Sequence, residues 1–189
     1  MKKFDVEIKR NVGAGEPLPV GGYVAKIMNA EVKEYYWGDV LVISFDIAEG
    51  EYKDFFANQY KANTNEDKKW KGNFRINVPQ EGNQWYDRQK RTFGNAIACI
   101  EDSNSGYHWD WDEEKLKGKL VGVLYRNYEY DIDGRQGWST ECGTFVGVDD
   151  IRNGNFRQMK DRPLKNKPVE TKPTVADFEE ILDEDLPFN

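Results

Sequence analysis

The first 150 residues consist largely of short runs in which apolar and polar residues alternate, the pattern of half-buried β-strands. The clearest run covers residues 41–47. An earlier run over residues 23–32 changes parity near Met28 and Asn29, which predicts a β-bulge in a long, bent strand. These two runs predict two long strands joined by a turn at residues 37–39.

Further strand signals follow along the chain. Residues 52–60 are interpreted as a third strand, and residues 74–78 form a shorter alternating run that ends before Pro79. Two long alternating runs, residues 119–131 and 138–148, are joined around Asp133-Gly134, a dipeptide typical of tight hairpin turns. The last two strands are therefore predicted to form a hairpin.

One segment, residues 85–101, has helical spacing. Its apolar residues at i, i+3, i+4 and i+7 are Phe93, Ala96, Ile97 and Ile100, one buried helical face. Three strands, one helix and a final hairpin is the element order of the OB-fold, a five-stranded Greek-key barrel. The sequence thus predicts a mainly β protein with a single OB-fold whose helix lies between strands 3 and 4; an SH3-like barrel or a small sandwich is the alternative.

Charge is distributed unevenly along the chain. Residues 1–151 hold 20 Lys and Arg against 26 Asp and Glu, residues 152–173 hold seven against two, and residues 174–189 hold six acids and no base. The middle stretch also has three prolines and few apolar residues, which disfavours a packed structure. We therefore predict an OB-fold domain (1–151), a basic flexible linker (152–173) and a disordered acidic tail (174–189) suited to binding other proteins.

Composition argues against several classes of protein. No uncharged apolar run approaches the roughly 20 residues that cross a bilayer, and the N-terminus lacks the apolar core of a secretory signal. The two cysteines, Cys99 and Cys142, and the one histidine, His108, supply neither a disulfide framework nor a zinc site. We expect a cytoplasmic protein that has no contact with membranes and binds no metal or cofactor.

Enzymatic motifs are weak. His108 is next to carboxylates but has no nucleophile motif or second histidine to work with. The acidic residues of segment 110–114 lack the glycine and the final glutamate of a calcium loop, and are interpreted as an acidic helix start. Gly13-Ala14-Gly15 is not followed by the Lys-Ser/Thr of a phosphate loop. The chain is therefore not expected to be an enzyme.

Aromatic and basic residues are interleaved where an OB-fold binds its ligand. Binding of unpaired strands requires aromatic faces for the bases and cations for the backbone, and the OB-fold places both over strands 2 and 3, between the first loop and the last hairpin. The candidates are Tyr35, Tyr36 and Trp37 in the first loop; Lys61, Lys68, Lys69, Trp70, Lys71 and Arg75 before the helix; and Tyr128, Tyr130, Arg135 and Trp138 in the hairpin.

Each of these groups has a simpler interpretation. The lysines could form only a solvated loop, and the hairpin aromatics, which share one parity, could pack across strands. Residues 35–37 are adjacent and cannot all face a core, because consecutive strand side chains point in opposite directions. At least one of these three aromatics should be exposed.

The end of the chain, Ile181 to Phe188, resembles the terminal peptide of bacterial single-stranded-DNA-binding proteins, although Asn189 follows the phenylalanine that usually comes last. The body, through residues 22–27 and 45–52, is similar to small DNA-binding proteins of phages and mobile elements of low-GC Gram-positive bacteria. The resemblance implies that the tail binds replication and recombination proteins. The partner-binding candidates are Phe178, Ile181, Leu182, Asp183, Glu184, Asp185, Leu186, Pro187 and Phe188.

Together these features predict a sequence-independent single-stranded-DNA-binding protein of phage or mobile-element replication or recombination. One alternative is a recombination mediator or inhibitor that works mainly through protein contacts. Another is an aromatic-rich carbohydrate-binding module, which would leave the basic segment and the acidic ending unexplained.

Overall fold

The computed structural model describes residues 15–164 of the 189-residue chain. The predicted partner-binding residues of the acidic tail therefore lie outside the described residues. The elements are β1 (Gly21–Tyr35), β2 (Gly38–Ile47), α1 (Phe55–Ala62), β3 (Asn73–Asn77), α2 (Tyr86–Asp102), the 3-10 helix η1 (Glu113–Leu116), β4 (Leu120–Ile132), β5 (Arg135–Val146) and α3 (Val148–Arg152).

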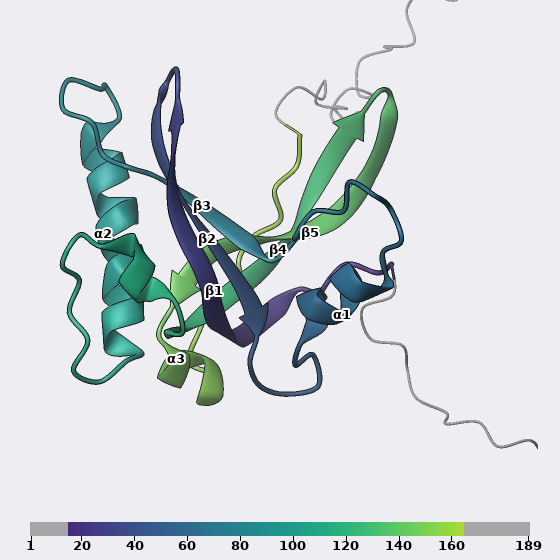
Figure 1. The fold of residues 1–189 in the computed structure, drawn as a ribbon. Helices are drawn as coiled ribbons and strands as arrows, with labels where there is room; N and C mark the ends of the chain where they lie inside the picture. The colour runs from purple at the N-terminus through teal and green to yellow at the C-terminus, as the bar shows by residue number, and fades with distance from the viewer. Residues whose placement is uncertain (1–14, 165–189) are drawn as a thin grey trace, which may run out of the picture.

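The five strands form one antiparallel sheet in the order β3-β2-β1-β4-β5. The prediction of a mainly β protein is confirmed. Within residues 15–164 no ladder joins the outer strands β3 and β5, so the sheet is not closed into a barrel. The β1–β2 and β4–β5 hairpins end on the same side of the molecule, and α2 lies along one flank of the sheet (Figure 1).

The predicted bulge in β1 is confirmed, because the pairing of β1 with β2 shifts register between Ile27 and Asn29. The first part of β1, Gly21 to Lys26, pairs with β4, and its pairing with β2 begins at Ala25 and continues to the end of the strand. A bulge increases local twist and bends a strand. The bend allows β1 to join the two hairpins in one sheet.

The core lies between the inner face of the sheet and its helices. Ile27, Ile43 and Phe45 from β1 and β2 are fully buried. The predicted apolar face of α2 is confirmed, since Phe93, Ala96, Ile97 and Ile100 are all buried against this core. No helix within residues 15–164 has the length and apolarity needed to cross a membrane.

The predicted third strand over residues 52–60 is wrong, because most of this segment is helix α1. The carboxylate of Asp46, at the end of β2, accepts hydrogen bonds from the backbone N–H groups of Ile47, Phe56 and Ala57 at 2.8, 2.9 and 3.0 Å. It therefore satisfies donors at the start of the helix that would otherwise lack partners. The third strand is instead the shorter alternating run, at Asn73–Asn77.

The chain after α3 returns along β4. β1 begins at Gly21, which pairs with Tyr125 of β4. After Tyr125, β4 therefore continues to pair with β5 along one edge, while the edge that faces β1 has no strand partner. Arg162 fills this edge, donating its N–H to the Asn127 carbonyl and accepting from the Glu129 N–H, both at 2.9 Å. Residues 153–164 of the predicted linker thus run back against the domain, whereas residues 165–173 lie outside the described part of the chain.

Candidate nucleic-acid interface

A cleft of about 880 Å³ lies where the sheet is open between β3 and β5. One side is formed by α1 and by residues 69–75, which lead into and include the start of β3. The other side is formed by residues 125–128 of β4, residues 139–143 of β5 and Arg162. The cleft thus joins segments that are far apart in the sequence.

Three exposed cations, Lys69, Lys71 and Arg75, line the first side. None of them forms an ion pair with an acidic residue among residues 15–164. Cations that lack an acidic partner present an uncompensated positive potential to an anionic ligand. This side of the cleft is therefore suited to a phosphate backbone.

Trp70 fixes the segment that carries these lysines. Its indole N–H donates to the carbonyls of Phe45 and Gly72, both at 3.0 Å, and its ring packs against the core. A side chain at Gly72 would place its Cβ 2.4 Å from the Phe45 carbonyl oxygen, so glycine permits the close approach to β2. With Trp70 turned toward the core, the flanking Lys69 and Lys71 remain exposed.

Aromatic side chains lie beside the cations in the cleft. Phe74 and Tyr128 line it from opposite sides and are half-buried. Phe74 packs on Phe145 with ring centroids 4.6 Å apart, which holds its ring in place beside Arg75. Such fixed rings provide surfaces on which unpaired bases stack.

Two lining residues carry groups that titrate only at high pH. Burial raises the pKa of the Tyr125 hydroxyl and, separately, that of the Cys142 thiol. Both groups are therefore neutral at physiological pH. A protonated thiol is a poor nucleophile, so Cys142 contributes packing surface to the cleft.

The tips of the two hairpins carry further exposed aromatics. Tyr36 is 98% exposed and Trp37 53% exposed at the β1–β2 turn, and Trp37 stacks on Tyr35 with centroids 4.5 Å apart. Trp138 on the β4–β5 hairpin is 52% exposed. The expectation that at least one of the residues 35–37 is exposed is confirmed.

The structure brings only part of the predicted site together. Lys69, Trp70, Lys71, Arg75 and Tyr128 line the cleft. The others lie outside it: Tyr35, Tyr36 and Trp37 at the first hairpin, Lys61 on α1, Lys68 with its Nζ over the Tyr60 ring, and Tyr130, Arg135 and Trp138 on the second hairpin.

The hairpin aromatics do not share one face, although their residue numbers have the same parity. Tyr130 pairs with Gly137, and Trp138 pairs with Glu129, so Trp138 is on the face opposite Tyr130. The reason is the two-residue turn, which pairs even-numbered positions with odd-numbered ones. Tyr130 lies over Gly137, where an added Cβ would be 2.5 Å from its hydroxyl oxygen, so this tyrosine packs across the strands.

Sequence reasoning missed Arg126 and Arg162, which line the cleft on the β4–β5 side. Arg126 lies within an ordinary alternating strand, and Arg162 lies in the predicted linker. No local pattern marks either residue, because their placement depends on cross-strand register and on the return of the chain along β4.

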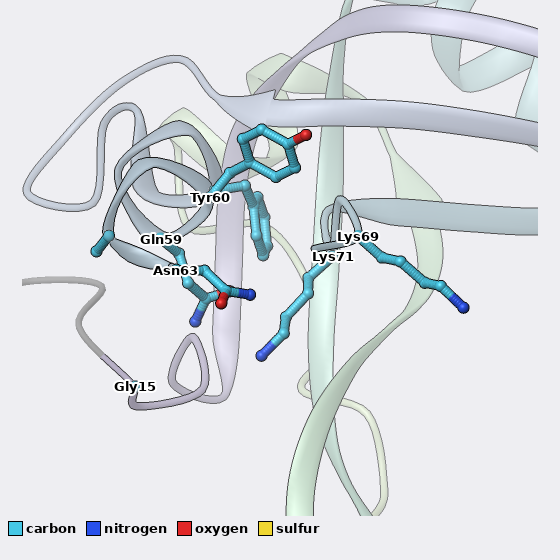
Figure 2. Close-up of a pocket in the computed structure, with 8 residues that line it drawn as sticks. Gly15, Gln59, Tyr60, Asn63, Lys69 and Lys71 are labelled. Atoms are coloured by element: carbon cyan, nitrogen blue, oxygen red, sulfur yellow. The ribbon is translucent and has the colours of Figure 1, made fainter. Parts of the chain in front are cut away.

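A smaller pocket of about 280 Å³ adjoins the cleft beside α1 and shares Lys69 and Lys71 with it. In Figure 2, Lys71 extends toward the side formed by Gln59 and Asn63, whereas Lys69 extends away from it. The pocket therefore continues the polar, cationic character of the cleft to the end of α1.

Residues 15–164 contain no group of three His, Cys, Asp or Glu side chains placed to hold a metal ion. The acidic segment 110–114 begins η1, as predicted, with the Asp112 carboxylate accepting from the Glu114 N–H at 3.2 Å.

No family model matches the chain, and comparison with curated proteins gives no match.

Proposed function

We propose that this protein binds single-stranded DNA without sequence preference, with the cleft between β3 and β5 as its binding site. The observation that carries the proposal is the set of three cations, Lys69, Lys71 and Arg75, beside the half-buried rings of Phe74 and Tyr128. The strand order supports it, because β3-β2-β1-β4-β5 is the order of an OB-fold barrel opened between its third and fifth strands.

The chemistry of the cleft favours unpaired strands over duplex. Stacking on an aromatic ring requires a base whose face is free, and every base has such a face. Lysine and arginine side chains bind the phosphate backbone whatever the sequence. Affinity should therefore depend on strandedness and salt more than on base identity.

Titration of labelled oligo-dT against the intact protein at two salt concentrations tests the proposal. Binding is expected to weaken as salt rises, because phosphate contacts release counterions, and oligo-dT and oligo-dC should bind with similar affinity. Equal or tighter binding of a duplex with the same length would contradict the proposal.

Trp37 and Trp138 lie outside the cleft, with Trp138 on the hairpin face opposite Tyr128, and their exposed rings should offer bases stacking surfaces separate from those of the cleft. Trp37→Ala and Trp138→Ala are each expected to weaken oligo-dT binding by about 1 to 3 kcal/mol, the usual contribution of one stacked base. Both rings are about half exposed, so circular dichroism should remain that of the folded protein. Trp85→Ala, which removes an equally exposed tryptophan at the start of α2, is the control and should leave affinity unchanged.

We also propose that the acidic end, residues 183–188, binds replication or recombination proteins. Its support is the sequence, in which carboxylates precede Leu186, Pro187 and Phe188. A short apolar peptide with acidic flanks suits a hydrophobic pocket that has a basic rim. On this proposal the cleft would bind the DNA while the tail recruits the proteins that act on it.

A further inference from the structure

Glu141 lies between two arginines in the cleft. Its Oε1 accepts a hydrogen bond from Nε of Arg126 at 3.0 Å and forms an ion pair with Nη2 of the same arginine, also at 3.0 Å. Its Oε2 forms an ion pair with Nη2 of Arg162 at 2.9 Å. All three residues line the cleft. One carboxylate therefore neutralises two of the cations that face the proposed ligand.

The fold builds this arrangement from three separate segments. Arg126 and Glu141 are direct cross-strand partners on β4 and β5. Arg162 arrives from the returning chain, through its parallel bridge with Tyr128, and its guanidinium lies 5.5 Å from the centroid of the Tyr128 ring. Through Arg162, the Arg–Glu–Arg group thus lies beside a ring that is itself a candidate for base stacking.

A phosphate and a carboxylate make the same charge-assisted hydrogen bonds with arginine. Glu141 and Arg126 both remain 24% exposed, so a ligand in the cleft can reach the group. We propose that Glu141 is a built-in counter-ion that competes with the DNA backbone for Arg126 and Arg162, and so limits both the affinity and its dependence on salt. This inference rests on the proposed function of the cleft.

The simpler role of Glu141 would be to hold the returning chain in place. That chain has other anchors: Gln158 donates to the Tyr125 carbonyl at 2.9 Å, and Asn127 donates to Asp161 at 3.0 Å, in addition to the two backbone bonds of Arg162. Glu141→Gln should therefore leave the fold intact. A purely anchoring role predicts binding that is unchanged or weaker, whereas a counter-ion role predicts tighter binding.

The test compares Glu141→Gln with the wild type in oligo-dT titrations over a range of salt concentrations. The variant is expected to bind about three- to ten-fold more tightly at low salt, since removal of the carboxylate frees two arginines for phosphate. The slope of log affinity against log salt should become steeper by up to about 1.4, or roughly 0.7 for each added phosphate contact.

Glu49→Gln is the matched control. It changes the net charge equally and removes a different ion pair, between Glu49 and Arg152 at 2.6 Å, at residues that do not line the cleft. Its salt slope should equal that of the wild type. An equal gain in affinity in both variants would show a general effect of net charge and would overturn the proposal.

A second comparison introduces Arg162→Gln into the wild type and into Glu141→Gln. It keeps the test decisive even if Glu141→Gln is less stable than the wild type. In the wild type, where Glu141 forms an ion pair with Arg162, the substitution should have little effect on oligo-dT affinity. In Glu141→Gln it should remove much of the gain in affinity. Equal losses in the two backgrounds, or an unchanged slope in Glu141→Gln, would overturn the counter-ion role while leaving DNA binding established. A wild type that does not bind oligo-dT would instead overturn the proposed function and this inference together.

Discussion

Replacing Lys69, Lys71 and Arg75 together by glutamine is expected to weaken oligo-dT binding by about 100-fold at roughly 50 mM salt. These are the cleft cations without an acidic partner among the described residues, so they are available to phosphate without breaking an ion pair. Losing three phosphate contacts should also reduce the salt slope by about 2, at about 0.7 per contact on a single strand. Fluorescence titration at several salt concentrations measures both quantities.

The control for this variant removes three cations from α2. Arg88, Lys90 and Arg91 are exposed on that helix and do not line the cleft, so their joint replacement by glutamine changes the net charge equally. Its effect on affinity and slope should be small. If the two triple variants lose affinity equally, binding depends on overall charge and the cleft is not the site.

Asp46→Ala is expected to lower the free energy of unfolding by about 3 kcal/mol, because hydrogen bonds to a charged acceptor each contribute about 1.5 to 3 kcal/mol and this variant loses three. The expected value is below the sum of the three bonds because the carboxylate is also costly to bury. Burial raises the pKa of Asp46, and the three N–H donors only partly offset this effect. Urea denaturation followed by circular dichroism measures the change.

Asp54→Asn is the comparison for Asp46→Ala. Asp54 directly precedes α1 with a φ of 59°, and its side chain makes no capping hydrogen bond. Asparagine tolerates this left-handed conformation, so the variant should be about as stable as the wild type. If Asp46→Ala were as stable as the wild type, the Asp46 carboxylate would not be what holds the start of α1 in place.

The parts of the fold predicted correctly are those encoded by local pattern. The buried face of α2, the bulge before Asn29 and the turn at Asp133-Gly134 each depend on residues a few positions apart. Helix α1 was missed because its capping carboxylate, Asp46, belongs to the preceding strand, ten positions before Phe56. A reading of residues 52–60 alone contains no sign of that cap.

The candidate site was predicted by residue type more successfully than by position. Lys69, Lys71 and Arg75 stood out as a dense cluster of cations around Trp70, and they do line the cleft. The partner of Arg126 is set by the register of β4 against β5, with 14 residues between the two positions, and no short-range pattern specifies it. The same dependence on register places Trp138 on the face opposite Tyr130, although the two residue numbers share one parity.

The open edge between β3 and β5 allows the dimensions of the proposed binding site to change independently of the rest of the sheet. Because no ladder within the described residues joins these strands, their separation can change without the loss of a backbone hydrogen bond. Insertions or deletions in residues 63–68, between α1 and the cationic segment, would alter the dimensions of the cleft while the register of the other strands stays the same. On the proposed function, designed changes in the length of this loop should alter the number of nucleotides that the cleft covers while the core stays the same.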